Sequence, residues 1–159
     1  MIGSFAYKQE LVDSMKVTFE AITFAEVDEV SADAFRKNVF YTAFSRSYWS
    51  QMAVVSPKFN VQISMYVIPN LVETLFANAY GGREFSADEK EVKMKDLVGE
   101  LLNIFGGYFM QKIQSVSGDF KLGFPQNSKG FKELPDDSAI VYYLIEDMYP
   151  LIVTIAPIT

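Results

Sequence analysis

The chain has 159 residues, 50% of them hydrophobic and 15% aromatic, and its 14 Lys and Arg against 20 Asp and Glu give a formal charge of -6. This composition excludes a disordered chain, and an acidic balance without clustered Lys or Arg argues against a nucleic acid partner. Cysteine and histidine are both absent, which excludes disulfides, thiolate nucleophiles, the usual zinc sites and catalytic triads with an imidazole base.

Length and composition predict one domain over residues 1–159. A chain of this size buries roughly 70% of its unfolded surface on folding, and neither a linker nor a fixed-period repeat divides it. The N-terminus lacks the charged and apolar regions of a signal peptide, and the apolar run at 149–158 is too short to span a bilayer. We therefore expect a cytoplasmic protein with no membrane partner.

The first predicted element is an amphipathic helix over 7–22, because apolar residues recur there at spacings of three and four. From 23 to 69 the pattern changes to short, partly alternating runs rich in Val, Phe and Tyr, which predict antiparallel strands in a meander. These runs cover 22–30, 38–49, 51–57 and 59–69, with turns near Asp33, Asn38, Ser56 and Pro57.

Two more helices are predicted in the middle of the chain. The second covers 69–80 and ends at the Gly-Gly pair 81–82 as a C-cap. The third begins after Ser86, which lies three residues before Glu89, the spacing of a capping box. It runs to about residue 115, and its length favours a kink or break at the glycine pair 106–107.

Strand-like runs return after the third helix, around 120–124, 139–145 and 151–155. Helices and strands thus come in blocks rather than alternating one by one. This order favours an α+β fold of two layers, with helices packed on one face of a mostly antiparallel sheet.

The third helix is predicted to be amphipathic, with one apolar and one polar face, since successive residues lie about 100° apart around a helix. Its apolar face comprises Met94, Leu97, Val98, Leu101, Phe105 and Phe109. Its polar face comprises Glu89, Lys93, Asp96, Glu100, Asn103, Gly107, Gln111 and Gln114. Glu100 and Asn103 are neighbours at i and i+3. One turn further on, Gly107 has no side chain, so a partner could approach the helix backbone closely there. The pattern therefore predicts a flat docking place with one carboxylate and one carboxamide.

Other interpretations fit the same residues. The polar face can be only the solvated side of the helix, and glycines in a helix can serve close packing between helices. A weak metal site on Glu89, Asp96 and Glu100 is a further alternative. However, carboxylates on an exposed helix rarely supply the several converging oxygens that Mg²⁺ or Ca²⁺ needs.

The stretch GELLNIFGG, 99–107, resembles the motif helix of the CheC/CheX family of chemotaxis phosphatases, whose signature is Glu-x-x-Asn followed by small residues. Glu100 and Asn103 match the pair, and Gly107 stands at the place of the family's glycine after the asparagine. The order of elements is similar along nearly the whole chain. The likeness is closer to CheX, because CheC-like members carry a second Glu-x-x-Asn in their first helix, where this chain has Glu10 and Asp13 but no asparagine.

The resemblance implies a phosphatase that hydrolyses the aspartyl phosphate of a CheY-like response regulator. In that role Asn103 would orient the attacking water and Glu100 would anchor the regulator's phosphate-binding lysine. Asp96, Gly107 and Gln111 would be further contacts to the partner. No cofactor is expected on this chain, because the regulator would hold Mg²⁺, and a homodimer with one site per chain is implied.

The resemblance also leaves a second function open. Flagellar switch relatives share the fold, lack the Glu/Asn pair and act as structural binding modules. After Asn103 this chain has IFGG, where the family more often has smaller residues around an alanine or serine. A non-catalytic interaction module of the same fold, in a switch or as a signalling adaptor, is therefore the alternative.

Overall fold

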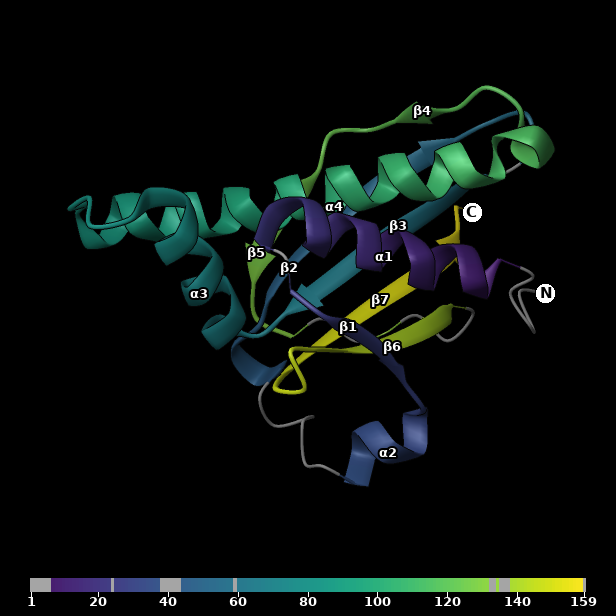
Figure 1. Cartoon of the computed structure of the whole chain (residues 1–159). Coiled ribbons are helices and arrows are strands. Elements are labelled where there is room, and N and C mark those ends of the chain that lie inside the picture. The colour runs from purple at the N-terminus through teal and green to yellow at the C-terminus, as the bar shows by residue number, and fades with distance from the viewer. Residues whose placement is uncertain are drawn as a thin grey trace.

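A computed structural model describes residues 7–23, 25–37, 44–58, 60–131, 134 and 138–158 of the chain. Its helices in these ranges are α1 (Lys8–Thr23), α2 (Ala32–Lys37), α3 (Pro69–Tyr80) and α4 (Ala87–Ser117). Its strands are β1 (Val27–Val30), β2 (Tyr48–Val55), β3 (Asn60–Val67), β4 (Lys121–Leu122), β5 (Gln126–Lys129), β6 (Ala139–Ile145) and β7 (Tyr149–Pro157). Figure 1 shows α1 and α4 side by side across one face of the sheet.

The described strands form one sheet in the order β1-β6-β7-β3-β2-β4, and every pairing in it is antiparallel. The edge beyond β2 is made of two short pieces. β4 pairs with Val54 and Val55 of β2, and β5 pairs with Tyr48 through Gln51. A loop at 123–125 therefore interrupts this edge. The α+β fold with helices packed on an antiparallel sheet is confirmed.

Both faces of the sheet are buried at its centre. On the helix side, Tyr48 donates a hydrogen bond to Glu91 of α4 (2.8 Å). On the other side, Phe35 of α2 packs on Tyr142, with ring centroids 4.6 Å apart, and Tyr142 is a register neighbour of Ile152. Register partners lead across the sheet from Tyr48 through Val67 and Leu151 to Tyr143. Tyr142 is next to Tyr143 and points to the opposite face, so α2 covers the face that α4 leaves open.

α4 is fixed on the sheet by a dry apolar face. Val98, Leu102, Phe105 and Phe109 are all fully buried. Its N-terminus is closed by the predicted capping box: the Ser86 hydroxyl accepts from the Glu89 N–H (3.2 Å), and the Glu89 carboxylate accepts from the Ser86 N–H (3.0 Å). In Figure 1 the helix lies between α1 and β4.

The predicted helices are confirmed. α3 has the predicted bounds and ends at Gly81, whose φ of 58° places it in the left-handed region. α1 and α4 differ from the prediction by one or two residues. Of the predicted kink or break in α4, the break is wrong, because the helix is continuous through Gly106 and Gly107; a kink there stays a prediction. Apolar residues of α4 are buried both before and after the two glycines, and this burial stabilises the helical conformation at the glycines.

The predicted meander is wrong in its first half. β1 pairs with β6 rather than with the next strand, and the turn expected at Asp33 is the helix α2, because Phe35 packs on the sheet. The runs 38–49 and 51–57 contribute one strand, β2. Asn38 and the rest of 38–43 lie outside the described residues. The strand β5 was not predicted, and the run at 120–124 contributes only β4.

In the part of the chain that the structure describes, no helix has both the length and the apolar character needed to cross a bilayer.

The capping box generates a first prediction. Ser86→Ala removes the hydroxyl that accepts from Glu89, so the free energy of unfolding should fall by about 1 kcal/mol, as measured by urea unfolding. Ser115→Ala is the matched control, because Ser115 is exposed near the other end of the same helix. It should be neutral or slightly stabilising. Equal losses in the two variants would contradict the role of the cap.

Candidate functional site

The Glu/Asn pair of α4 lies on its exposed face. Glu100 and Asn103 are both exposed, and Leu101 and Leu102 between them are buried. Packing of these leucines fixes the rotation of the helix about its axis. The two polar side chains therefore project together from adjacent turns, where the Cβ atoms of i and i+3 residues lie about 5–6 Å apart.

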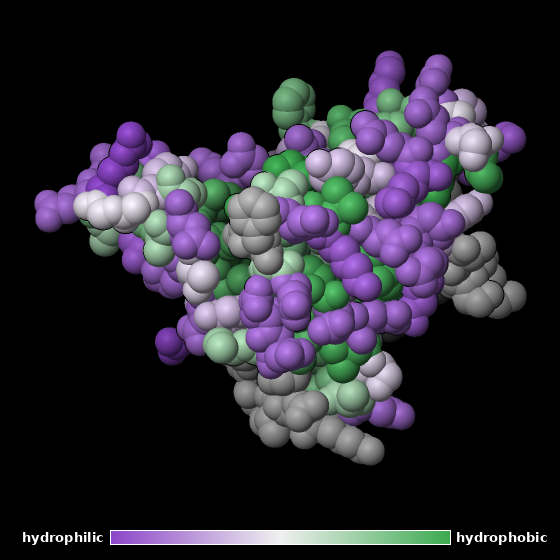
Figure 2. Space-filling model, in the orientation of Figure 1, coloured by the Kyte–Doolittle hydropathy of each residue, from purple (hydrophilic) through white to green (hydrophobic). Residues whose placement is uncertain are grey.

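These side chains line one wall of an open cleft of about 330 Å³. Asp96 and Gly99 belong to the same wall. The opposite wall is the edge of the sheet, with Leu122 of β4, the loop residues Gly123, Phe124 and Pro125, and Asn127 of β5. The cleft is therefore built between a helix and the interrupted sheet edge beside it. In the view of Figure 2 the surface is mostly hydrophilic, with smaller apolar areas between the polar side chains.

Asn127 reaches from the sheet edge to the helix backbone at Gly99. A Cβ at Gly99 would lie 2.5 Å from the Oδ1 atom of Asn127 and 2.6 Å from its Nδ2 atom. Both distances are far below van der Waals contact, so any side chain at 99 would displace the carboxamide. The fully buried Ser50 of β2 donates a hydrogen bond to Asn127 Oδ1 (2.6 Å) and holds it there.

The glycines of α4 thus have different surroundings. Gly99 leaves room for Asn127, and Gly106 faces the sheet, where a Cβ would lie 2.5 Å from the Cε atom of Met52. Around Gly107 no heavy atom of the described residues lies within 4 Å of the place a Cβ would take, apart from its chain neighbours and the backbone of its own helix. Nothing in the described fold therefore requires a glycine at 107, which leaves its surface open to a partner.

A second cleft, of about 290 Å³, lies on the other side of Glu100. It is formed between α1, α3 and α4 and is mostly apolar, with Ile22, Leu75 and Leu97 among its lining residues. Glu100 lines both clefts. Glu100 therefore lies between the two clefts.

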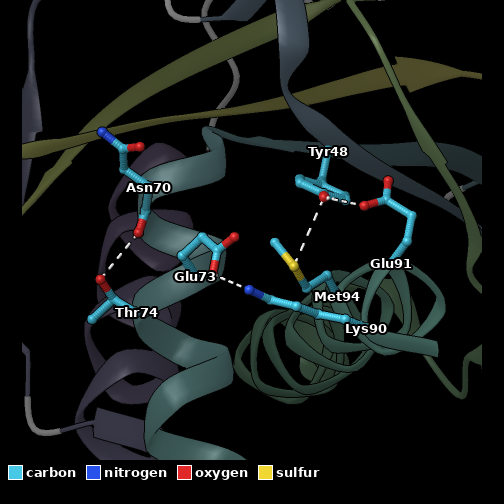
Figure 3. Close-up of polar contacts among 7 residues, drawn as sticks. All are labelled: Tyr48, Asn70, Glu73, Thr74, Lys90, Glu91 and Met94. Carbon is cyan, nitrogen blue, oxygen red and sulfur yellow. Dashed lines mark hydrogen bonds and ion pairs between the residues drawn. The ribbon is translucent and has the colours of Figure 1, made fainter. Parts of the chain in front are cut away.

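Polar contacts tie the N-terminal half of α4 to the sheet and to α3 (Figure 3). Lys90 forms an ion pair with Glu73 of α3 (2.9 Å), and Glu91 pairs with Lys129 of β5 (3.4 Å) as well as with Tyr48. Burial together with the Glu91 carboxylate raises the pKa of Tyr48. Burial opposes ionisation of Glu91, but the contacts with Tyr48 and Lys129 outweigh it and lower the pKa of that carboxyl. Lys129 shares β5 with Asn127, so these contacts also fix the second wall of the cleft.

The structure brings three of the predicted site residues into one cleft: Asp96, Glu100 and Asn103. Gly107 and Gln111 lie further along the same helix and do not line it. Glu89, Asp96 and Glu100 do not converge on a metal site; among the described residues no group of three Asp or Glu side chains is placed to hold an ion.

Sequence reasoning missed the second wall. No periodicity could place residues 122–127 over α4, because β4 and β5 are too short to show alternation. The available signal was the exposed apolar residue in the turn-like sequence Gly-Phe-Pro at 123–125.

The sequence matches no protein-family model and no curated protein sequence. The structure does have similar solved structures. CheX from Vibrio vulnificus matches with a TM-score of 0.71 at 15% identity, over 94% of this chain and 95% of that one. The chain has the fold of the CheX and CheC-like chemotaxis proteins. A chain of the CheX–CheY–BeF3–Mg²⁺ complex from Borrelia burgdorferi matches with a TM-score of 0.70 at 14% identity, over 94% and 96%. FliY from Thermotoga maritima matches with a TM-score of 0.62 at 14% identity, over 96% of this chain and 88% of that one.

The surroundings of the glycines generate the second prediction. Gly107→Ala should raise the free energy of unfolding by about 1 kcal/mol, because alanine is the better helix former and its methyl group meets nothing. Gly99→Ala, in the same helix, should give no gain, because the methyl group displaces Asn127 from Ser50. Urea unfolding of both variants tests this. Equal stabilisation would contradict the close approach of Asn127 to the helix.

Proposed function

We propose that this chain is a phosphatase that hydrolyses the aspartyl phosphate of a CheY-like response regulator, in chemotaxis or a related two-component pathway. The observation that carries the proposal is the exposed pair Glu100 and Asn103 in one cleft of a CheX-like fold. A similar fold occurs in the CheX of the CheX–CheY–BeF3–Mg²⁺ complex. That complex supports a receiver of the CheY type as the partner.

Asn103 is suited to orient the attacking water. An aspartyl phosphate is an acyl phosphate, so its hydrolysis mainly needs a water in line with the leaving oxygen and stabilisation of the phosphoryl charge. The water oxygen bonds to phosphorus and the bond from phosphorus to the aspartate oxygen breaks. The products are the free aspartate carboxylate and inorganic phosphate, which keeps both protons of the water. A neutral carboxamide accepts a hydrogen bond from the water without repelling the phosphoryl group. We assign no general base.

Glu100 is suited to dock the receiver rather than to touch phosphate. Asp96 and Glu100 make this wall of the cleft acidic, and two carboxylates would repel a phosphoryl group unless cations stood between them. One of these cations is a lysine of the receiver, which makes a charge-assisted hydrogen bond to Glu100. The other is Mg²⁺ held by the receiver. The chain itself therefore needs no cofactor in this proposal.

Phe124 offers an apolar contact at the rim of the same cleft. Its side chain is 96% exposed, on the loop between β4 and β5. Large apolar side chains this exposed commonly mark interaction sites, and aromatic residues are enriched among those that dominate binding energy. The rim thus supports docking of a protein surface rather than of a small molecule. Gly107 and Gln111 extend the contact along α4, and we expect a homodimer with one such site per chain.

The second candidate is a non-catalytic binding module, supported by the similar fold of FliY. A module of this kind would bind a receiver and leave its phosphate intact. The Glu/Asn pair and the open cleft favour catalysis, and the assay below separates the two functions.

Hydrolysis should depend on Asn103. Asn103→Ala should slow dephosphorylation of a phosphorylated CheY-like receiver by at least about 100-fold, as expected when an interaction of the transition state is lost, while affinity for the receiver changes little. Glu100→Gln should instead raise the half-saturating receiver concentration by about 10-fold. Asn70→Ala, which removes an exposed carboxamide from the first turn of α3, is the control. Unchanged hydrolysis by Asn103→Ala would overturn the proposal.

Docking should depend on Phe124. Phe124→Ala should raise the half-saturating receiver concentration about 5-fold or more and leave the maximal rate unchanged, because the loop touches the partner and not the phosphorus. Met148→Ala is the control, since Met148 is 61% exposed on the turn between β6 and β7. If both variants behave like the unmodified protein, the rim at Phe124 takes no part in docking.

A further inference from the structure

We propose that Asn127 is a second carboxamide of the site, whose Nδ2 hydrogens bind an oxygen of the receiver's phosphoryl group. This inference rests on the phosphatase function proposed above. Asn127 lies on the sheet edge, 24 residues after Asn103 in the sequence. The two residues line opposite walls of the same cleft. The site would then hold the phosphoryl group between a helix and a strand.

The carboxamide of Asn127 is held in one orientation. Ser50 donates to its Oδ1 atom (2.6 Å) from a fully buried position on β2. In this hydrogen bond the hydroxyl of Ser50 donates and the amide oxygen accepts, so neither hydrogen of Nδ2 is used by Ser50. Both Oδ1 and Nδ2, the latter with two N–H donors, lie against the helix at Gly99, the residue before Glu100.

The donors of Nδ2 are free. Within the described residues the hydrogen bond from Ser50 accounts for the polar contacts of Asn127, and it uses the oxygen alone. The buried polar side-chain atoms that have no partner there are the hydroxyls of Tyr143 and Thr154. Nδ2 has no hydrogen-bond partner among the described residues, yet it is not one of these buried atoms, so at the half-buried Asn127 it is accessible to solvent.

In an acidic cleft, these neutral donors are suited to bind a phosphoryl oxygen. Among the described residues, the lining of the cleft has two carboxylates, Asp96 and Glu100, and no Lys or Arg. Of the described side chains that line the cleft, the carboxamides of Asn103 and Asn127 are the neutral donors that a phosphoryl anion would meet. With Asn103 engaged by the attacking water, Asn127 remains to bind a phosphoryl oxygen, and preorganised donors of this kind stabilise charge that develops in a transition state.

The glycine at 99 supports the same assignment. Glycine inside a helix is destabilising relative to alanine, and here the space it leaves is filled by the carboxamide of Asn127. The sequence thus keeps a less favourable helix residue where a larger one would push Asn127 away from both Ser50 and the cleft.

Asn127→Asp is the sharpest test, because a carboxylate keeps the size of the side chain and still accepts from Ser50 but has no donor. Asn127→Ala removes the donors without adding charge. Both should lower the maximal rate of phospho-receiver hydrolysis by about 10-fold or more, whereas affinity for the unphosphorylated receiver should change little with Asn127→Ala. Gln126→Glu is the control: it makes the same chemical change on the neighbouring, exposed residue of β5 and should stay within about 2-fold of the unmodified protein.

A third variant separates the loss of the Nδ2 donors from the loss of their fixed orientation. Ser50→Ala leaves the donors of Asn127 in place but frees the carboxamide to rotate, so it should give a smaller loss of rate than Asn127→Ala. If both Asn127 variants hydrolyse as fast as the unmodified protein while Asn103→Ala is inactive, the phosphatase function stands and the role of Asn127 is overturned. If the unmodified protein hydrolyses no phospho-receiver, both are overturned.

Discussion

Packing of α4 on the sheet is the constraint on which the rest of the structure depends. The fully buried Val98, Leu102, Phe105 and Phe109 leave the helix no freedom to rotate, and truncating one buried phenylalanine typically costs about 3–5 kcal/mol. That is a large part of the stability of a domain, about 5–15 kcal/mol. The exposed face is thereby determined by the buried one. Glu100 and Asn103 project together because the leucines between them are held in the core.

The site needs the sheet edge as much as the helix. β4 and β5 pair with different halves of β2, and the loop between them carries Phe124 beside α4. The contacts of Glu91 with Tyr48 and Lys129 connect the same edge to the helix. Two walls from distant parts of the sequence are therefore held in fixed relation. A preorganised cleft of this kind suits a reaction in which the protein mainly positions a water and a charged group.

The helices and the Glu/Asn pair could be predicted from the sequence because both depend on local patterns. The capping box at Ser86 and the spacing of Glu100 and Asn103 need only neighbours within one turn. The fold class followed from the order of blocks. By contrast, Phe35 is the one buried residue among 32–36 of α2, and β5 is the polar run QNSK. Neither shows a period, because each is fixed by contact with a strand far away in the sequence.

The same limit explains what was missed in the site. Gly99 was noted only as part of a motif, and its reason, the approach of Asn127, is a contact with the edge strand. Gly106 and Gly107 look alike in the sequence, yet one packs against Met52 and the other faces open space. A pattern within one helix cannot separate them, since the difference lies in what the sheet places beside each.

The proposed phosphatase function can be tested by the lifetime of the aspartyl phosphate on a purified CheY-like receiver with Mg²⁺, measured with this protein at substoichiometric concentration. If the function is correct, each molecule of the protein dephosphorylates many receivers, so the lifetime shortens in proportion to the amount added. An unchanged lifetime with a receiver that binds the protein would contradict it, and would make the cleft a docking site without catalysis.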